Sequence, residues 1–195
     1  METIVQAKRV LEIFKEMSQI PRESGNEKGI SDYIVNFAKN LGLEAHQDEI
    51  LNVVIKKAAS PGYESRPSII IQGHIDMVCV KDHASNHNFA KDPIANIIEG
   101  EWMRADHTTL GADNGMGAAM MLAILEDESQ QHGPMQLLFT TNEETGMDGA
   151  FALKEGQVTG DYLINLDTEV EHDFTVSCAG GCHVHVNIPL LRDNN

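Results

Sequence analysis

Six acidic and imidazole side chains of this sequence follow apolar runs, and their types suit the binding of metal ions. The first two, His74 and Asp76, come shortly after the β-branched run 69–71. Such a run is typical of a strand buried on both faces in a parallel sheet. With one residue between them, Asp76 can accept a hydrogen bond from the second ring nitrogen of His74, which fixes the tautomer of a metal-binding histidine. Taken alone, the pair is also explained as a polar turn at a strand end.

The same arrangement recurs further along the chain. Two adjacent carboxylates, Glu143 and Glu144, follow a second apolar strand pattern, and Asp167 follows a third. A further acid, Asp113, stands among glycines at the start of a predicted buried helix. Because the carboxyl ends of neighbouring parallel strands lie about 5 Å apart at one edge of a sheet, we expect these groups to converge.

The chemistry of such a cluster is that of a metal-dependent hydrolase. Several carboxylates in one crevice repel one another and shift toward protonation, and a pair of divalent cations removes this difficulty. One histidine with several carboxylates suits zinc, manganese or cobalt better than a thiolate site would. Two such ions about 3.5 to 4 Å apart commonly serve the hydrolysis of amides and phosphoesters. If these groups were ordinary polar residues at strand ends, three strands would have to end in acidic or imidazole groups by coincidence.

Apolar spacing and turn residues predict the elements that position these groups. A first helix is predicted over 3–19, and a second, with Ser24 or Asn26 as its N-cap, stops near Gly42. A buried helix over 118–125 and a helix over 147–153 are predicted, and 79–98 is expected to be an irregular loop. Strands are predicted over 43–49, 53–57, 69–77, 101–104, 135–140 and 161–167, with two more of an antiparallel kind over 174–178 and 183–190.

These elements predict an α/β fold, a three-layer α/β/α sandwich with a mostly parallel central sheet and an antiparallel pair near 43–57. At 195 residues the chain can bury one sizeable core. The formal net charge of −16 argues against a nucleic-acid or anionic-membrane partner. No apolar run approaches the roughly 18 to 20 residues of a membrane span, and the N-terminus lacks a secretory signal. Together with three cysteines that form no framework, this predicts a cytoplasmic protein.

Four motifs, in this order along the chain, resemble those of the di-zinc aminopeptidase/aminoacylase superfamily. They are Gly-His74-Ile-Asp76-Met-Val, Gly111-Ala-Asp113-Asn114-Gly115, Thr-Asn-Glu143-Glu144-Thr-Gly and Asn165-Leu-Asp167. Within the superfamily the chain is more similar to the bacterial aminoacyl-histidine dipeptidases, also called cytosolic non-specific dipeptidases. The similarity covers essentially the whole chain.

The resemblance implies a centre of two divalent metal ions, zinc in the first place, with cobalt or manganese as alternatives. Its metal ligands would be Asp113 as the bridge, His74 and Asp167 on one ion, and Glu144 on the other. Asp76 would orient His74. Glu143 would be the general base that passes a proton from water to the leaving amine. The implied substrates are dipeptides with a free α-amine, Xaa-His included. Members of the family also tend to hold the bond between Asp113 and the following residue in the cis form.

The resemblance further implies a longer protein. Residues 1–180 would be the N-terminal portion of a metallopeptidase catalytic domain, and 181–195 the start of a lid domain through which full-length relatives form homodimers. The last histidine ligand and the lid would lie beyond this sequence. We therefore expect the chain alone to be inactive or nearly so, with an uncovered sheet edge that favours self-association.

Other functions are compatible with the same residues. A tripeptidase or aminoacylase of the superfamily would share the motifs, and a catalytically silent metal-binding domain would need only the ligands. A separate zinc cluster at Cys178, Cys182, His183 and His185 is possible, although strand alternation explains this pattern more simply. His107 precedes Asp113 and could approach the site, or it is a polar loop residue like His83 and His87, which we expect to be exposed to solvent.

Overall fold

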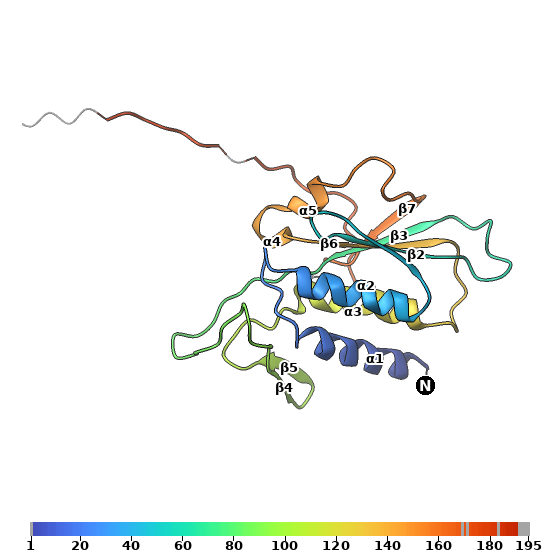
Figure 1. The fold of residues 1–195 in the computed structure, drawn as a ribbon, viewed down its shortest axis with the longest axis horizontal. Helices are drawn as coiled ribbons and strands as arrows, with labels where there is room; N and C mark the ends of the chain where they lie inside the picture. The colour runs from blue at the N-terminus through green and yellow to red at the C-terminus, as the bar shows by residue number, and fades with distance from the viewer. Residues whose placement is uncertain (1, 169, 171, 183, 191–195) are drawn as a thin grey trace, which may run out of the picture.

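The centre of the fold is a five-stranded sheet with the strand order β1-β2-β6-β3-β7 (Figure 1). The computed structural model describes residues 2–168, 170, 172–182 and 184–190. β3 lies between β6 and β7 and runs parallel to both, whereas β2 pairs antiparallel with β1 and with β6. The strands are β1 (Glu44–Gln47), β2 (Val53–Lys57), β3 (Ile69–His74), β6 (Met135–Thr140) and β7 (Tyr162–Asn165). The predicted α/β fold and its antiparallel pair near 43–57 are confirmed, and the sheet as a whole is mixed.

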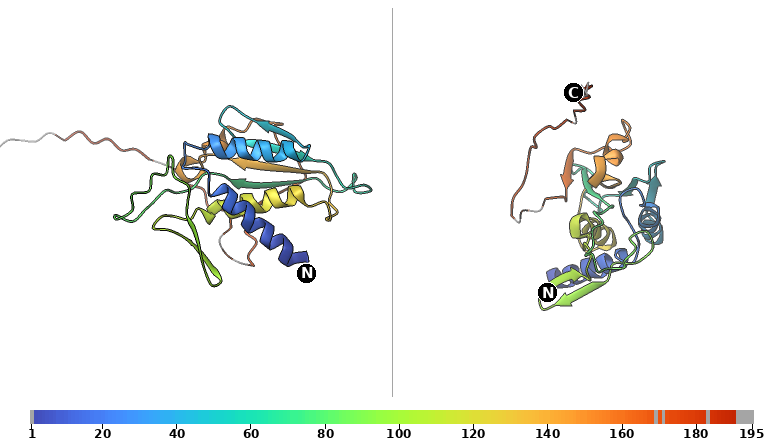
Figure 2. Two further views of the ribbon diagram at one scale, coloured as in Figure 1. Left: turned by 60° about the horizontal axis from the view of Figure 1, so that its bottom comes forward. Right: turned by 90° about the vertical axis from the view of Figure 1, so that its left-hand side faces the viewer.

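Two long helices, α2 (Lys28–Asn40) and α3 (Ala112–Glu126), pack on one face of this sheet (Figures 1 and 2). A third, α1 (Glu2–Met17), packs on the outer side of α3, and short elements cover the other face of the sheet. Alternate side chains of each strand point to opposite faces, so Val53 and Ile55 join the main core while Val54 joins a smaller cluster. That cluster packs against Leu153 and Val158, which follow the short helices α4 (Glu143–Gly146) and α5 (Asp148–Phe151). Among the described residues, no helix is long and apolar enough to cross a membrane.

The helix predicted over 118–125 is the central part of α3, and its apolar composition fits its position between the sheet and α1. α3 carries apolar side chains all around its circumference, because it packs against the sheet on one side and α1 on the other. Met121 and Leu122 are fully buried there. Such a helix fixes the position of its first residues, which include Asp113, relative to the end of β3.

The buried core gives a stability prediction at β2. Ile55 has no exposed surface, whereas Ile98 of β4 (Asn96–Glu99) is 56% exposed. Ile55→Val removes a methylene group from a packed site and is expected to lower the free energy of unfolding by about 1 kcal/mol. The same change at Ile98 is expected to have little effect. Urea denaturation of both variants measures the difference, and equal losses would contradict the packing described here.

Two sequence predictions differ from the structure in the C-terminal part of the chain. Residues 174–178 and 184–190 form no strand, and His183 of the second predicted strand lies outside the described residues. Phe174 and Val176 are each 95% exposed. An alternating pattern forms a strand only when a neighbouring strand pairs with it, and the part of the chain that the structure describes offers none here. β7 is the sheet edge on this side, and its side chains are exposed, as expected.

Three local predictions also need correction. The end of the loop predicted over 79–98 forms β4, which pairs with β5 (Trp102–Ala105) as a separate two-stranded sheet. Of the helix predicted over 147–153, only Asp148–Phe151 is helical, as α5. Met147, with a left-handed φ of 59°, separates α5 from the preceding helix α4. Neither Ser24 nor Asn26 caps α2, which follows Glu27 without a side-chain cap. The hydroxyl of Ser24 bonds to a distant partner instead.

Candidate metal centre

The parallel strands β3, β6 and β7 end at one edge of the sheet and bring the predicted side chains together. His74 is the last residue of β3 and lies opposite Thr140, the last residue of β6. Glu143 and Glu144 begin α4 just beyond β6, and Asp167 follows β7. Apolar strands buried in the sheet thus hold polar groups at their carboxyl ends, where ligands bind in open α/β sheets.

His74 is the common centre of the cluster. Its Nε2 atom lies 3.0 Å from an oxygen of Asp113, 3.6 Å from one of Asp167 and 3.9 Å from one of Glu143. The imidazole is 1% exposed, whereas the side chain of Asp113 is 51% exposed. The histidine therefore forms the floor of the site, and the carboxylates line its open side.

Two sets of possible metal ligands share this histidine. One consists of His74, Asp113 and Asp167, the other of His74, Glu143 and Glu144, and within each set the ligand atoms lie within 4.8 Å of one another. Nitrogen and oxygen donors on a tetrahedral zinc ion, each about 2.0 to 2.2 Å from the metal, are roughly 3.3 to 3.6 Å apart, so a side-chain shift of about an ångström brings each set onto one ion. Among the described residues, His74 is the only cationic partner at ion-pair distance from these carboxylates. Imidazole and carboxylate donors with surplus negative charge fit divalent cations such as zinc.

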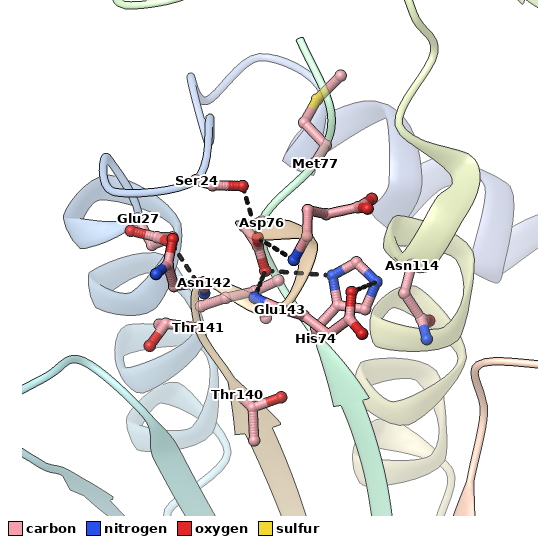
Figure 3. A network of polar contacts seen from close by, with 12 residues as sticks. Ser24, Glu27, His74, Asp76, Met77, Asn114, Thr140, Thr141, Asn142 and Glu143 are labelled. Atoms are coloured by element: carbon pink, nitrogen blue, oxygen red, sulfur yellow. Dashed lines mark hydrogen bonds and ion pairs between the residues drawn. The ribbon is translucent and has the colours of Figure 1, made fainter. Parts of the chain in front are cut away.

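Asp76 lies beneath the cluster and is fully buried. One of its oxygens accepts hydrogen bonds from Nδ1 of His74 at 3.2 Å and from the backbone N–H of Glu143 at 3.1 Å. The other accepts from the hydroxyl of Ser24 at 2.7 Å and the backbone N–H of Glu144 at 3.2 Å (Figure 3). The predicted contact with His74 is confirmed. In addition, Asp76 joins the histidine to the start of α4, which the sequence did not predict.

The turn from β6 into α4 is held by buried side chains through four consecutive N–H groups. Besides the two bonds to Asp76, Asn52 accepts from the N–H of Thr141 at 3.1 Å and Glu27 accepts from that of Asn142 at 3.0 Å. Asn142 has φ of 52°, a left-handed conformation that an asparagine tolerates. Glu143 is therefore placed by contacts to its backbone, and its carboxylate stays free to face the site.

Asp113 is positioned by an irregular start of α3. The peptide bond between Asp113 and Asn114 is cis, as the resemblance implied, and both residues have non-helical backbone angles. The side chain of Asn114 is buried and donates to an oxygen of Asp167 at 2.7 Å. A Cβ atom at Gly117 would lie 1.9 Å from the side-chain oxygen of Asn114, so only glycine fits there. The amide thus couples two of the possible ligands.

Burial and charge shift the protonation of the cluster in the metal-free chain. Burial alone would lower the pKa of His74, but hydrogen bonds and attraction from Asp167 and Asp76 outweigh it and raise the pKa to about 10. Burial likewise acts to raise the pKa of Asp76, and bonds from His74, Ser24 and a backbone N–H hold it at about 2. The pKa of Glu143 is raised by burial, and the nearby Asp167 adds to the effect.

These shifts predict how the stability of the metal-free chain depends on pH. Because the pKa of His74 in the fold lies above its ordinary value of about 6.5, its charged form stabilises the fold fully below pH 6.5. This contribution is expected to disappear as the pH rises from 6.5 toward 10. Urea denaturation with a chelator at pH 6.5, 8 and 9.5 measures the decrease. His74→Gln should flatten the curve, and a parallel curve for this variant would contradict the assignment.

Comparison with known proteins places the chain in a family. The model of Peptidase family M20/M25/M40 matches residues 70–188, which include the whole cluster. The chain belongs to this family. The cytosol non-specific dipeptidase of Escherichia coli (strain K12) is 44% identical over 182 residues, covering 93% of this chain and 38% of that protein. The uncharacterized protein YqjE of Bacillus subtilis (strain 168) is 27% identical, covering 85% of this chain and 44% of that protein.

Solved structures of peptidases show the same fold. The aminoacylhistidine dipeptidase from Vibrio alginolyticus has a TM-score of 0.81 and 44% identity, covering 84% of this chain and 33% of that one. A tripeptidase from Staphylococcus aureus has a TM-score of 0.70 and 27% identity, covering 84% of this chain and 44% of that one. The resemblance stated from the motifs is thus confirmed, and the chain spans less than half the length of these relatives.

The six site residues predicted from the sequence all meet in this M20/M25/M40 chain, and the alternatives do not join them. His107 bonds to Asp82 at 2.6 Å and is exposed. Of the possible second zinc cluster, Cys178 and Cys182 are exposed free thiols, and no group of metal ligands in the described part of the chain includes them. His83 is exposed as predicted, whereas His87 packs its ring against Phe89.

Sequence reasoning missed the residues that hold the ligands in place. Arg22, Ser24, Glu27, Asn52 and Asn114 bond to the backbone or the carboxylates of the site. Their partners lie far away in the sequence, so no local spacing reveals them. The polar run 22–27 after Pro21 was a signal, but a turn with a helix cap explained it equally well.

Proposed function

We propose that this chain is the metal-binding and water-activating part of a dipeptidase of the cytosol. The observation that carries the proposal is the pair of ligand sets that share His74, with Glu143 beside it. Identity of 44% to a cytosol non-specific dipeptidase and to an aminoacylhistidine dipeptidase supports the reaction class. Dipeptides with a free α-amine, Xaa-His included, are the proposed substrates.

In this proposal two divalent ions would be held by four side chains. Asp113 would be shared by both ions, His74 and Asp167 would hold one, and Glu144 would hold the other. Zinc is the proposed metal, with cobalt or manganese as alternatives. When bound, the ions supply Lewis acidity to water and to the peptide carbonyl. Asn114 keeps Asp167 turned toward the cluster, and Asp76 keeps the metal-binding nitrogen of His74 directed at it.

Glu143 is the proposed general base. Its backbone N–H is held by Asp76, and its carboxylate oxygen lies 3.9 Å from His74 on the open side of the cluster. Burial raises its pKa, which makes the carboxylate a better proton acceptor. Glu143 takes a proton from the attacking water and delivers it to the amine nitrogen that leaves.

The reaction is tested in a chimera, in which this chain replaces the matching part of the E. coli cytosol non-specific dipeptidase. Hydrolysis of alanyl-histidine by the chimera is measured with zinc, after chelation, and after zinc is restored. We expect zinc-dependent hydrolysis that chelation abolishes. A folded, zinc-loaded chimera no faster than zinc in buffer would contradict the proposed function.

A second candidate, a metal-binding domain without activity, is favoured by the number of imidazoles. In the described part of the chain, His74 is the one histidine in either ligand set. Calorimetric titration of zinc into the 195-residue chain and its Asp113→Ala variant tests the ligand assignment, with Asp82→Ala as an exposed control. We expect the chain to bind zinc, the Asp113 variant to lose this binding, and the chain alone to hydrolyse alanyl-histidine little or not at all.

A further inference from the structure

The segment between α1 and α2 contacts all three parts of the chain that carry the proposed ligands and general base. Arg22 bonds to the end of β3 and to the start of α3, Ser24 to the carboxylate below His74, and Glu27 to the turn after β6. These residues lie behind the cluster, and none of them belongs to either ligand set. We call residues 22–27 the bracket segment.

Arg22 makes the central contacts. Its guanidinium is 2% exposed and donates from Nη1 to the carbonyl oxygens of Ile75 at 3.1 Å and Asp76 at 3.0 Å, and from Nη2 to that of Gly111. The planar guanidinium carries several donors in fixed directions, so a single side chain sets the separation of these two backbone segments. One of them contains His74, and the other leads into Asp113.

The glycines around Asp113 are shaped to admit this side chain. A Cβ atom at Gly111 would lie 2.5 Å from Nη2 of Arg22, and one at Gly115 would lie 2.6 Å from the same atom. Gly111 also has φ of 72°, which side chains rarely adopt. The two glycines of the Gly111–Gly115 motif therefore leave the space that the guanidinium of Arg22 occupies beside Asp113.

The main chain and the other polar groups of the bracket segment complete the attachment. The carbonyl of Arg22 accepts from the N–H of Met77 at 3.1 Å, and Glu23 forms a parallel bridge with Met77. Ser24 donates to Asp76 at 2.7 Å, and Glu27 accepts from the N–H of Asn142 (Figure 3). All three site segments are thus fixed to one stretch of backbone.

We propose that Arg22 and Ser24 are positioning residues of the metal centre, and that Arg22 sets the distance between His74 and Asp113 through its bonds to the two backbone segments. The proposal rests on the proposed function, because it assigns a role within that site. Arg22 keeps its charge at neutral pH, since burial lowers its pKa only to about 10 while Asp76, Cys79 and Asp113 oppose the shift. A role of geometry and a role of charge therefore predict different results.

Three variants of the 195-residue chain separate these roles. Arg22→Lys keeps the charge and loses the planar arrangement of donors, Arg22→Met loses both, and Ser24→Ala loses one bond to Asp76. Positioning predicts that zinc affinity falls about 10- to 100-fold in both Arg22 variants and about tenfold in Ser24→Ala. If only charge mattered, Arg22→Lys would bind like the wild type, and Arg22→Met would bind zinc more tightly because a cation near the ions is gone.

Matched controls distinguish positioning from general stability. Ser68→Ala removes the same kind of serine-to-aspartate bond, to Asp161, at the start of β3 away from the site. Arg9→Met removes an arginine that joins α1 to Glu126 of α3. Both controls are expected to keep the zinc affinity of the wild type, even where urea denaturation shows a loss of stability.

The measurements are zinc affinity by chelator competition, the visible spectrum of the Co²⁺ form, and urea denaturation. The Co²⁺ spectrum of Arg22→Lys is expected to change because the ligand geometry changes. If folded Arg22→Lys and Ser24→Ala bound zinc within twofold of the wild-type affinity, this inference would be overturned, and the proposed function would be unaffected. If Arg22→Lys does not fold, the zinc affinities of Ser24→Ala and Ser68→Ala decide: equal affinities would overturn the inference. A wild-type chain that binds no zinc would contradict the proposed function and the inference together.

Discussion

Replacing Asp76 by asparagine is expected to lower the zinc affinity about 10- to 100-fold and the free energy of unfolding by about 3 to 5 kcal/mol. The buried carboxylate accepts four hydrogen bonds, from His74, Ser24 and the N–H groups of Glu143 and Glu144. An asparagine has the same shape, but its NH₂ group replaces one of the two carboxylate oxygens and faces the two donors that this oxygen accepted from. The charged His74 of the metal-free chain then loses its buried partner.

The control for this prediction is Asp161→Asn. Asp161 also accepts from a serine hydroxyl and a backbone N–H, both of Ser68, but it lies on the surface. We expect the control to change zinc affinity by less than about twofold, because its bonds are made in water and away from the site. Calorimetry and urea denaturation measure both variants. Equal behaviour of the two would mean that Asp76 does not organise the centre.

Glu143→Gln is expected to reduce alanyl-histidine hydrolysis by the chimera about 10²- to 10⁴-fold while zinc stays bound. Glutamine keeps the size of the side chain, and its backbone N–H still bonds to Asp76. It cannot accept the proton of the attacking water. The rate at saturating substrate is therefore expected to fall more than the apparent substrate affinity.

Glu144→Gln is the informative comparison, because the two residues are neighbours on α4 with similar exposure. Because Glu144 is a proposed ligand, Glu144→Gln is expected to weaken zinc binding first, and a high zinc concentration should partly restore its activity. Activity of Glu143→Gln should not respond to added zinc. If zinc restored the Glu143 variant, or if its activity were close to that of the parent chimera, the general base would have to be a different group.

Much of the centre was predictable because it depends on two simple regularities. The apolar runs that became β3, β6 and β7 are followed at once by polar groups, and parallel strands end at the same edge. His74 and Asp167 were therefore predicted to meet, because each follows an apolar run assigned to the same parallel sheet. The roles of Asp113 as a bridge and Glu143 as a base came from the resemblance, since no spacing in the sequence distinguishes them.

The remaining features depend on contacts between distant segments. Ser24 has the local signature of a helix cap, and only the fold shows that its hydroxyl reaches Asp76 instead. Arg22 gives no pattern at all, because its acceptors are backbone carbonyls that every residue possesses. The strand predicted from the alternation over 174–178 is wrong, because a strand needs a neighbouring strand, which the alternation of side chains does not supply.

The four N–H groups of Thr141–Glu144, which donate to three buried side chains, have a consequence for hydrogen exchange. A turn at the mouth of a site normally exchanges its amide protons quickly, through small local openings. Here the acceptors are Asn52, Glu27 and Asp76, which belong to three segments packed into the core. The turn cannot open without releasing them, so its amides should exchange as slowly as those of β6. Glu143, the proposed base, then belongs to the cooperative unit of the fold, and its position is set before any ion or substrate binds.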